Sequence, residues 1–350
     1  MRTVGIALIG CGDIARTAHL PALRSLGGRV RLVAAMDVDR AAAERVGSEW
    51  GAFATTDLGE ALDRAGVEAV VCCTPEFSHR QVVAEAASRG LHVLCEKPMA
   101  ASLADADAMI AAAKDAGTVL MIGHSRRFTG RYMALRQAVR AGEVGEVRLV
   151  RENERRARPA EGRAGGYWTR SHWTGDPERS AGAILTNGIH EADLFNWFVG
   201  APPVRVYAER RVTRPDGLVA DFISFTVRYA NGALAASEVN NALPPGYPAF
   251  HEFELFGTEG AVRARDHEMR ALERHDAAGM HAPRVYEHLL HVGHAYEREH
   301  EAFLHSVETG EPPPVTPTEA RLALQVALAA DEAARTGQPV TLTQEGGEAS

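Results

Sequence analysis

The fold of this chain is decided by one stretch near its start, Val4-Gly5-Ile6-Ala7-Leu8-Ile9-Gly10-Cys11-Gly12-Asp13-Ile14-Ala15. The apolar run predicts a buried strand, and the glycine-rich segment after it opens a predicted helix. In that context Gly10 permits a tight turn, Gly12 lets the backbone approach a pyrophosphate, and Ala15 allows the helix to pack closely on the strand. The N–H groups at the start of the helix favour a diphosphate. The stretch therefore predicts a dinucleotide site.

A carboxylate at the end of the next predicted strand supports this interpretation. Asp37 follows an apolar run, near the spacing expected for an acid that accepts hydrogen bonds from both ribose hydroxyls. A solvated strand end or a helix cap is the alternative for Asp37. Arg40 could lie over the adenine or meet a 2′-phosphate. Because Asp37 is followed by Val38 and Asp39 rather than by small hydroxyl and basic residues, we expect NAD rather than NADP.

Short apolar runs alternate with alanine-rich helical segments over the first third of the chain, and this rhythm stops after about Gly123. The alternation predicts an α/β Rossmann domain with a doubly wound parallel sheet over residues 1–123. Strand signals without regular helices predict an α+β domain with a large, mostly antiparallel sheet over residues 124–343, before a disordered tail at 344–350. The predicted strands are 4–9, 32–36, 67–73, 92–95, 119–122, 146–154, 204–212, 223–228, 234–240 and 252–256, and the predicted helices are 14–26, 40–49, 79–88, 103–116, 190–198, 286–308 and 317–336.

Composition and charge limit the class of function. With 350 residues, of which 45% are hydrophobic and 24% charged, two globular domains are expected. The net charge of −8 disfavours a nucleic-acid partner, which is bound mainly through Lys and Arg. We expect no membrane segment and, because no signal cleavage site follows the apolar start, a cytoplasmic protein. The four cysteines lack metal-ligand spacing, so we expect no metal.

Two residues are candidates for reactive chemistry. Cys95-Glu96-Lys97-Pro98 ends the fourth predicted strand, and ligands bind outside the carboxyl ends of strands in an open parallel sheet, so Lys97 is expected to face that crevice. His190 lies three residues before Asp193 on a later predicted helix, so the two side chains share a face. A helix-capping or core histidine is the alternative for His190 alone.

These motifs, together with three further segments, resemble the Gfo/Idh/MocA family, named after glucose-fructose oxidoreductase and inositol dehydrogenase. Thr74-Pro75 followed by His79 resembles the family's loop after the third strand, which covers the cofactor. The segment from Gly123 to Phe128 resembles its Arg-Phe segment at the domain junction, and the segment from Gly182 to Asp193 resembles its helix start with the catalytic histidine. The order and spacing of these segments carry the resemblance over nearly the whole chain.

The resemblance implies hydride transfer between a nicotinamide and a secondary alcohol or ketone of a sugar, glycoside or cyclitol. Such a reaction needs a base, for which a histidine with an ordinary pKa near 6.5 is suited, and a lysine ammonium would stabilise a developing alkoxide. We therefore expect as catalytic residues Lys97, His190 and Thr186; as substrate-binding residues Asp193, Arg127, Trp168 and Asn187; and as cofactor-binding residues Gly10, Gly12, Asp13, Ile14, Asp37, Arg40, Thr74, Pro75, His79, Glu96 and Lys97.

Two positions depart from the family pattern. Thr186 stands where the family often has Asp or Asn, and it carries no charge that could tune His190. Ser125 stands where Asn is common. These differences indicate a substrate outside the best-known inositol enzymes. The segment around Trp168 could stack on a sugar ring.

Other interpretations stay open at this point. An NADP-dependent ketone reductase acting on a modified sugar, or a nonenzymatic dinucleotide-sensing regulator, would share the fold, although a pure sensor needs neither Lys97 nor His190. The histidines from His281 to His305 invite a metal interpretation, but surface or subunit-contact histidines are preferred. The charge-rich segment 152–158 is interpreted as a solvated strand edge. A sheet with one open face favours a homodimer or homotetramer.

Overall fold

The computed structural model comprises two units, and each is described by itself. It describes residues 2–157, 173–177, 179–180, 182–213, 217–244, 247, 249–265, 272–276, 279–281 and 293–343. The first unit comprises Met1–Thr129 and His291–Arg321, and the second comprises Gly130–Leu290 and Leu322–Ser350. The domain limits predicted from the sequence stay predictions, and the tail at 344–350 lies outside the described residues.

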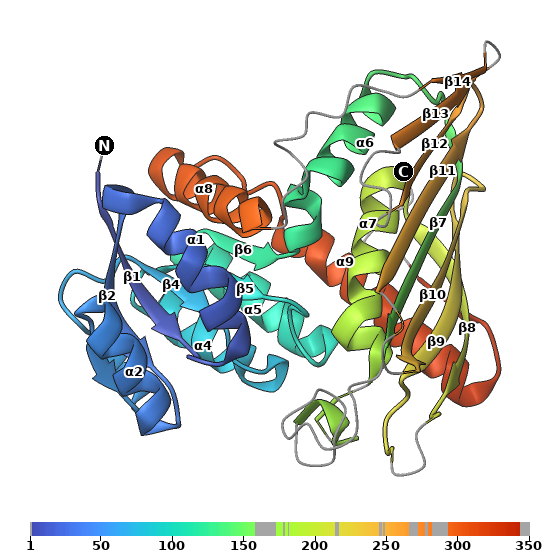
Figure 1. The fold of residues 1–350 in the computed structure, drawn as a ribbon. Helices are drawn as coiled ribbons and strands as arrows, with labels where there is room; N and C mark the ends of the chain where they lie inside the picture. The colour runs from blue at the N-terminus through green and yellow to red at the C-terminus, as the bar shows by residue number, and fades with distance from the viewer. Residues whose placement is uncertain are drawn as a thin grey trace. The chain divides into compact units, whose positions relative to one another are not determined.

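The first unit is built on a parallel sheet with helices on both faces (Figure 1). Its strands are β1 (Val4–Ile9), β2 (Val30–Met36), β3 (Phe53–Thr55), β4 (Ala69–Cys72), β5 (His92–Glu96) and β6 (Leu120–Gly123). Its helices are η1 (Ala15–His19), α1 (Leu20–Ser25), η2 (Gly27–Arg29), α2 (Arg40–Trp50), α3 (Leu58–Leu62), α4 (Glu76–Ser88), α5 (Leu103–Ala116), η3 (Ser125–Phe128) and α8 (Gly293–Thr309). The strand order β3-β2-β1-β4-β5-β6 confirms the predicted doubly wound sheet.

The apolar runs of the first unit form strands because the sheet is covered on both sides. All six residues of β1 are buried, as are all four of β4. The prediction missed β3 and α3, which are three and five residues long and too short to show a period. The helix after the glycine loop begins as the π-helix η1, and a π turn holds one residue more than an α turn.

The second unit contains a nine-stranded sheet. Its strands are β7 (Val147–Ala157), β8 (Pro203–Arg211), β9 (Phe222–Tyr229), β10 (Leu234–Leu243), β11 (Phe250–Gly257), β12 (Ala261–Arg265), β13 (Leu272–Asp276), β14 (Gly279–His281) and β15 (Val340–Thr341); its helices are α6 (Gly130–Arg140), η4 (Trp173–Gly175), η5 (Ile184–Gly188), α7 (Ile189–Val199) and most of α9 (Pro317–Thr336). The order is β14-β13-β12-β11-β7-β10-β9-β8-β15. Only β7 and β10 pair in parallel among these strands, which confirms a mostly antiparallel sheet.

Alternating side chains of this sheet divide it into a covered and an open face. Along β9, Phe225 and Val227 are buried, whereas Thr226 and Arg228, each one position further on, are exposed. The ring of Phe225 lies 6.0 Å from the ring of Phe195 in α7, the helix that lies against the covered face in Figure 1. The core of the second unit therefore lies between the sheet and its helices.

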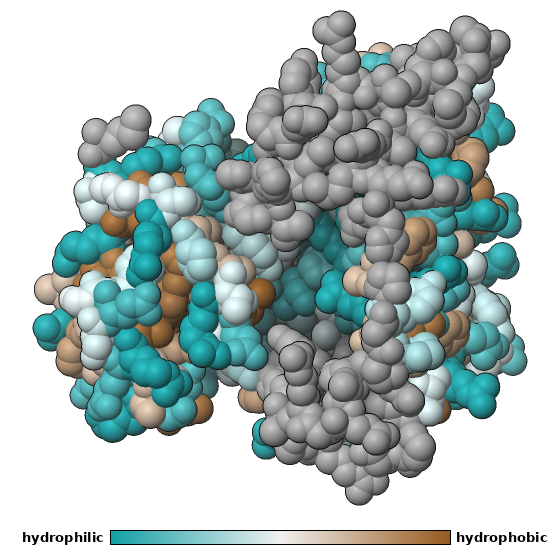
Figure 2. Space-filling view, in the orientation of Figure 1, coloured by the Kyte–Doolittle hydropathy of each residue, from teal (hydrophilic) through white to brown (hydrophobic). Residues whose placement is uncertain are grey.

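Several local predictions can be compared with the structure. The helix predicted over 286–308 is described from Gly293 on, and His300 within it is 1% exposed, so the interpretation of His300 as a surface residue is wrong. Helix α9 begins as predicted, because Thr316 Oγ1 accepts from the backbone N–H of Glu319 at 3.2 Å and caps it. On the face shown in Figure 2, hydrophilic residues predominate over the described surface of the first unit. No described helix is long and apolar enough to cross a membrane.

Candidate active site

The loop after β1 is shaped by its glycines. Gly10 has φ +92°, and a Cβ on it would lie 2.7 Å from the carbonyl carbon of Cys73, so a larger residue does not fit between this loop and the end of β4. A Cβ on Gly12, in contrast, would meet no heavy atom within 4 Å. The backbone at Gly12 is therefore open to close approach, which fits the pyrophosphate of a dinucleotide.

The carboxylate of Asp37 joins the end of β2 to the glycine loop. Its Oδ2 accepts from the backbone N–H of Cys11 at 2.7 Å, and its Oδ1 accepts from that of Asp39 at 2.9 Å. Each oxygen keeps a further lone pair for a ribose hydroxyl. Arg40 is exposed, and its Nη1 lies 3.7 Å from Glu44 Oε1. Asp37 therefore lies beside the glycine loop, where its carboxylate could accept from a dinucleotide ribose.

His79 ties together the loops that follow β4 and β5. The residue is 1% exposed, its Nε2 lies 2.8 Å from Thr74 O, and its Nδ1 lies 3.0 Å from Pro98 O. Carbonyl oxygens only accept and a neutral imidazole carries one N–H, so the tautomer decides which ring nitrogen donates. The Thr74-Pro75 loop and the segment around Lys97 are therefore held together at the carboxyl edge of the sheet.

Cys72, His79 and Cys95 offer atoms that lie within 4.8 Å of one another, a grouping that could hold a metal ion. The two ring nitrogens of His79 lie 3.0 and 2.8 Å from carbonyl oxygens, so a metal would compete with a hydrogen bond of this ring. A hydrogen bond from Cys95 lowers the pKa of the Cys72 thiol to about 6 against the opposing effect of burial. Hydrogen bonds within the protein therefore engage these side chains, and the absence of a metal expected from the sequence stays a prediction.

Glu96 and Lys97 form the end of β5. Glu96 is 4% exposed, its Oε2 accepts from the backbone N–H of Lys97 at 2.9 Å, and its Oε1 accepts from His19 Nε2 at 2.9 Å. Burial raises the pKa of Glu96, but the hydrogen bond from His19 and the charges of His19 and Lys97 outweigh it and hold the pKa below its usual value. Burial raises the pKa of Glu76, and the charge of Lys97 acts in the opposite direction. Half-buried Lys97 therefore interacts with two buried acids.

In the second unit, the predicted site residues lie on one continuous segment. Thr186 and Asn187 belong to the π-helix η5, and His190 and Asp193 follow in α7. Asp193 is 1% exposed, whereas Thr186 and His190 are half-buried. Asn187 Nδ2 donates to Glu154 Oε1 at 3.0 Å. The segment that carries His190 is therefore anchored to β7.

Two acids of β7 face the covered side of the sheet. Glu152 and Glu154 are 0% exposed, so their interpretation as part of a solvated edge is wrong. Tyr132 donates its hydroxyl to Glu152, and Glu154 forms an ion pair with Arg156. His251 Nε2 on the neighbouring strand lies 3.7 Å from Glu154 Oε1. Alternate residues of a strand point to one face, and here that face is the one covered by helices.

The roles predicted for Arg127 and Trp168 stay predictions. Arg127 is 4% exposed, and its Nη1 donates to Glu319 Oε1 at 3.2 Å and to Pro314 O at 3.4 Å, which ties η3 to the start of α9. Trp168 lies outside the described residues. Lys97 belongs to the first unit and His190 to the second, so the structure describes each half of the predicted site by itself.

Sequence reasoning missed two buried residues next to this site. His19 bonds to Glu96, and Glu299 in α8 is 0% exposed, with Glu96 among the groups that raise its pKa. The only available signal is weak: each is a titratable residue within a predicted helix. Their position depends on the packing of α8 and η1 in the first unit.

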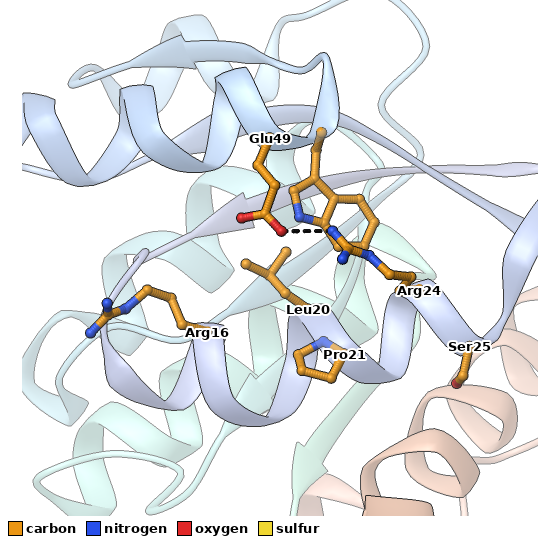
Figure 3. Close-up of a pocket in the computed structure, with 7 residues that line it drawn as sticks. Arg16, Leu20, Pro21, Arg24, Ser25 and Glu49 are labelled. Atoms are coloured by element: carbon orange, nitrogen blue, oxygen red, sulfur yellow. Dashed lines mark hydrogen bonds and ion pairs between the residues drawn. The ribbon is translucent and has the colours of Figure 1, made fainter.

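A groove of about 480 Å³ opens between α1 and α2 (Figure 3). It is lined by Arg16, Leu20, Pro21, Arg24, Ser25, Glu49 and Trp50. Arg24 Nη2 donates to Glu49 Oε1 at 2.7 Å, and its guanidinium lies 4.8 Å from the ring centroid of Trp50. The lining contains no predicted site residue, so the groove adds nothing to the candidate active site.

A doubly wound parallel sheet, an open glycine loop and an acid at the end of β2 define a dinucleotide-binding α/β protein. Residues 4–124 match the family model of the oxidoreductase family with an NAD-binding Rossmann fold, and residues 132–263 match that of the GFO/IDH/MocA C-terminal domain. The chain belongs to the Gfo/Idh/MocA family of oxidoreductases. The family resemblance and the NAD cofactor predicted from the sequence are thereby confirmed.

Named relatives cover most or nearly all of this chain. It is 28% identical to myo-inositol 2-dehydrogenase of Thermotoga maritima, over 97% of this chain and 98% of that protein. It is 31% identical to inositol 2-dehydrogenase 2 of Paenarthrobacter aurescens, over 77% of this chain and 78% of that protein. The structure of GenD2 from gentamicin A biosynthesis in complex with NAD is similar with a TM-score of 0.83 and 26% identity, covering 98% of this chain and 97% of that one.

Proposed function

We propose that this chain oxidises a secondary hydroxyl of a sugar, glycoside or cyclitol with NAD as the hydride acceptor. The observation that carries this proposal is the place of Lys97, which directly follows β5 at the carboxyl edge of the sheet and interacts with Glu76 and Glu96. A regulator that only senses a dinucleotide needs the glycine loop but no lysine there. The activities named for the two dehydrogenase relatives support the substrate class.

The residues of this chain divide the chemistry between them. NAD, when bound, supplies the carbon that takes the hydride. The Lys97 ammonium donates to the reacting oxygen and stabilises the negative charge that develops on it. The His190 imidazole takes the hydroxyl proton and returns it in the reverse direction. Thr186 orients His190 through its hydroxyl, while Asn187 and Asp193 bind other hydroxyls of the substrate.

A screen of substrates tests the proposal. The purified protein is mixed with NAD and, in turn, with inositols, monosaccharides, glycosides and aminosugars, and the absorbance of reduced nicotinamide is followed. We expect turnover with at least one polyol class. Binding of NAD without turnover of any class would instead support the sensing regulator, and reduction of keto sugars by NADPH alone would support the ketone reductase.

Cofactor choice gives a first prediction. Asp37→Ser removes an acceptor for the ribose hydroxyls and a charge that repels a 2′-phosphate, so kcat/KM with NAD falls roughly 10- to 100-fold, since hydrogen bonds to charged groups contribute about 1.5–3 kcal/mol. Activity with NADP rises, with Arg40 as the phosphate partner. Comparing kcat/KM for both cofactors in the wild type and the variant checks this, and a wild type that prefers NADP contradicts the role of Asp37.

Thr186 gives a second prediction. Thr186→Asp places a carboxylate four residues before His190, and a nearby negative charge raises the pKa of a histidine, so the pH profile of kcat/KM shifts to higher pH. The profile is measured between pH 5 and 10 for both proteins. Thr186→Asn serves as the uncharged control, which should leave the profile in place. An unshifted profile for Thr186→Asp means that Thr186 does not act on His190.

We further infer a cytoplasmic homo-oligomer. The four free, buried cysteines support a reducing compartment. Tyr207 and Leu234 are exposed on the open face of the second unit's sheet, where they pair with Thr226 and Arg228. Such a face offers a surface to a second copy of the chain. Sedimentation equilibrium tests this, with a dimer or tetramer expected and a monomer contradicting it.

A further inference from the structure

A run of hydrogen bonds links the lysine strand to the interior of the first unit. Glu96 Oε1 accepts from His19 Nε2 at 2.9 Å, and His19 Nδ1 lies 3.0 Å from His300 Nε2. We call Glu96, His19 and His300 the histidine relay. Its members are between 0% and 4% exposed. On its outer side, Glu96 Oε2 accepts from the backbone N–H of Lys97.

The histidine relay joins three elements that are far apart in the sequence. His19 ends η1, the π-helix after the glycine loop, Glu96 ends β5, and His300 lies in α8. The ring of His19 is further fixed between two rings of α8, with centroids 5.1 Å from Tyr296 and 5.2 Å from His300. The glycine-loop helix therefore contacts the residue that precedes Lys97 directly, and α8 is linked to that residue through His19.

The direction of the hydrogen bond between His19 and Glu96 follows from the charge of the carboxylate. A carboxylate only accepts, so His19 Nε2 donates to Glu96. Burial lowers the pKa of His300 well below its usual value, so His300 is neutral. From α8, Glu299 and Tyr296 also face Glu96, and burial, together with the charge of Glu96, raises the pKa of both.

Cys73, which follows β4, also interacts with Glu96. Burial, followed by the charge of Glu96, raises the pKa of the Cys73 thiol. Neutral Glu299, Tyr296 and Cys73 do not compensate a negative charge. His19 and Lys97 are the neighbours that favour the charged form of Glu96. A buried carboxylate that loses its partner has no compensating charge, and this destabilises the folded protein.

We propose that His19 and His300 are positioning residues for Lys97, which act through Glu96. His300 holds His19, His19 orients the Glu96 carboxylate, and Glu96 holds the main chain of Lys97 and places a negative charge near its ammonium. The inference rests on the proposed function only in taking Lys97 as catalytic. Without His19, the hydrogen bond that fixes Glu96 Oε1 is lost, and Lys97 then loses a negative neighbour held in place beside it. An ammonium that loses such a neighbour gives up its proton at lower pH.

Lysine-selective NMR tests this directly, because the chain contains only two lysines, Lys97 and Lys114. Protein labelled with 13C at the ε carbon of lysine is titrated, and exposed Lys114 serves as the internal reference. In His19→Leu we expect the Lys97 midpoint to fall by about one pH unit, the lower range for loss of an adjacent opposite charge. In His300→Leu the Lys97 midpoint falls by a smaller amount, and the midpoint of Lys114 is unchanged in both variants.

Kinetics supply the second readout. His19→Leu lowers kcat roughly 10- to 100-fold, the usual cost of losing a residue that orients a reactive group. His19→Gln keeps an N–H for Glu96 and recovers most of the loss. Leu304→Ala, at a buried apolar position of the same helix α8, serves as the control for destabilisation and leaves both kcat and the Lys97 midpoint unchanged below its melting temperature.

The outcomes separate this inference from the proposed function. An unchanged Lys97 midpoint in His19→Leu overturns the positioning role, whatever the rates are. An equal shift in Leu304→Ala overturns it too, because general loosening would then explain the result. If His19→Leu does not fold, the Lys97 midpoint is measured in His300→Leu and His19→Gln instead, and those values decide whether the positioning role holds. If Lys97→Ala keeps full turnover, the catalytic assignment fails, while the NMR result still decides whether His19 acts on Lys97.

Discussion

Replacing Lys97 or His190 by alanine lowers kcat by roughly 10²- to 10⁴-fold, the range that a general acid or base contributes. The Kd for NAD stays within a few-fold, because the glycine loop and Asp37 hold the dinucleotide. Initial rates with the substrate found in the screen give kcat, and quenching of tryptophan fluorescence gives the affinity for NAD. The physical reason for this split is that both side chains act on charge and protons that move during the reaction.

Two matched controls sharpen this experiment. Lys114→Ala removes the other lysine, which is exposed on α5, and His305→Ala removes an exposed histidine of α8. Both variants should keep wild-type kcat. Full turnover in Lys97→Ala and His190→Ala would show that neither residue belongs to the catalytic machinery. A large loss of NAD affinity in Lys97→Ala without a change in kcat would show that Lys97 binds the cofactor and has no catalytic role.

The second large effect concerns stability. Glu299 is 0% exposed, and neither of its carboxyl oxygens has a hydrogen-bond partner among the described residues. Burial first, and the charge of Glu96 second, raise its pKa well above the usual value, so the folded protein favours its protonated form. In the unfolded chain it ionises above about pH 4.3. Unfolding therefore releases a proton.

The sign of the pH dependence follows from this release. Stability falls as pH rises above the unfolded pKa, by about 1.4 kcal/mol per pH unit, until the pH reaches the folded pKa. Glu299→Gln has the same shape and cannot ionise. We therefore expect the variant to match the wild type near pH 4 and to become the more stable of the two as the pH rises toward 8.

Urea unfolding at one-unit steps from pH 4 to pH 8 measures this difference. Glu301→Gln, at an exposed position two residues on in α8, is the control and should leave the slope of stability against pH unchanged. Parallel curves for the wild type and Glu299→Gln would mean that Glu299 is ionised in the folded protein. The same result would imply that a positive charge or a hydrogen-bond donor stabilises the Glu299 carboxylate.

Those parts of the fold that depend on local pattern could be predicted. The limits of α5 and α9 match the predicted 103–116 and 317–336, because a Ser102 cap or a Thr316 cap marks each start and a glycine follows each helix by one residue. Strand β1 also matches, since a strand buried on both faces is a continuous apolar run. The edge strand β3 could not be found, because three half-buried residues show no period.

The residues of the candidate site also divide into those that could be predicted from the sequence and those that could not. Gly10, Gly12 and Asp37 could be identified because a strand, a loop, a helix and the next strand follow one another within a short stretch, and the backbone there needs glycine. The burial of Glu152 and Glu154 could not, because a strand with alternating charges looks the same whether its second face meets water or a helix.

The doubly wound sheet, the dinucleotide loop and the family could be recognised without a structure, because each depends on neighbouring residues and their periodicity. Which titratable groups meet depends instead on the packing of distant segments. His19 and Glu96 are separated by 77 positions, and His19 and His300 by 281, yet each pair is joined by one hydrogen bond. The charge of a buried group depends on what surrounds it in space. Packing, rather than sequence spacing, therefore sets the charge states of Glu96, Glu299 and His300.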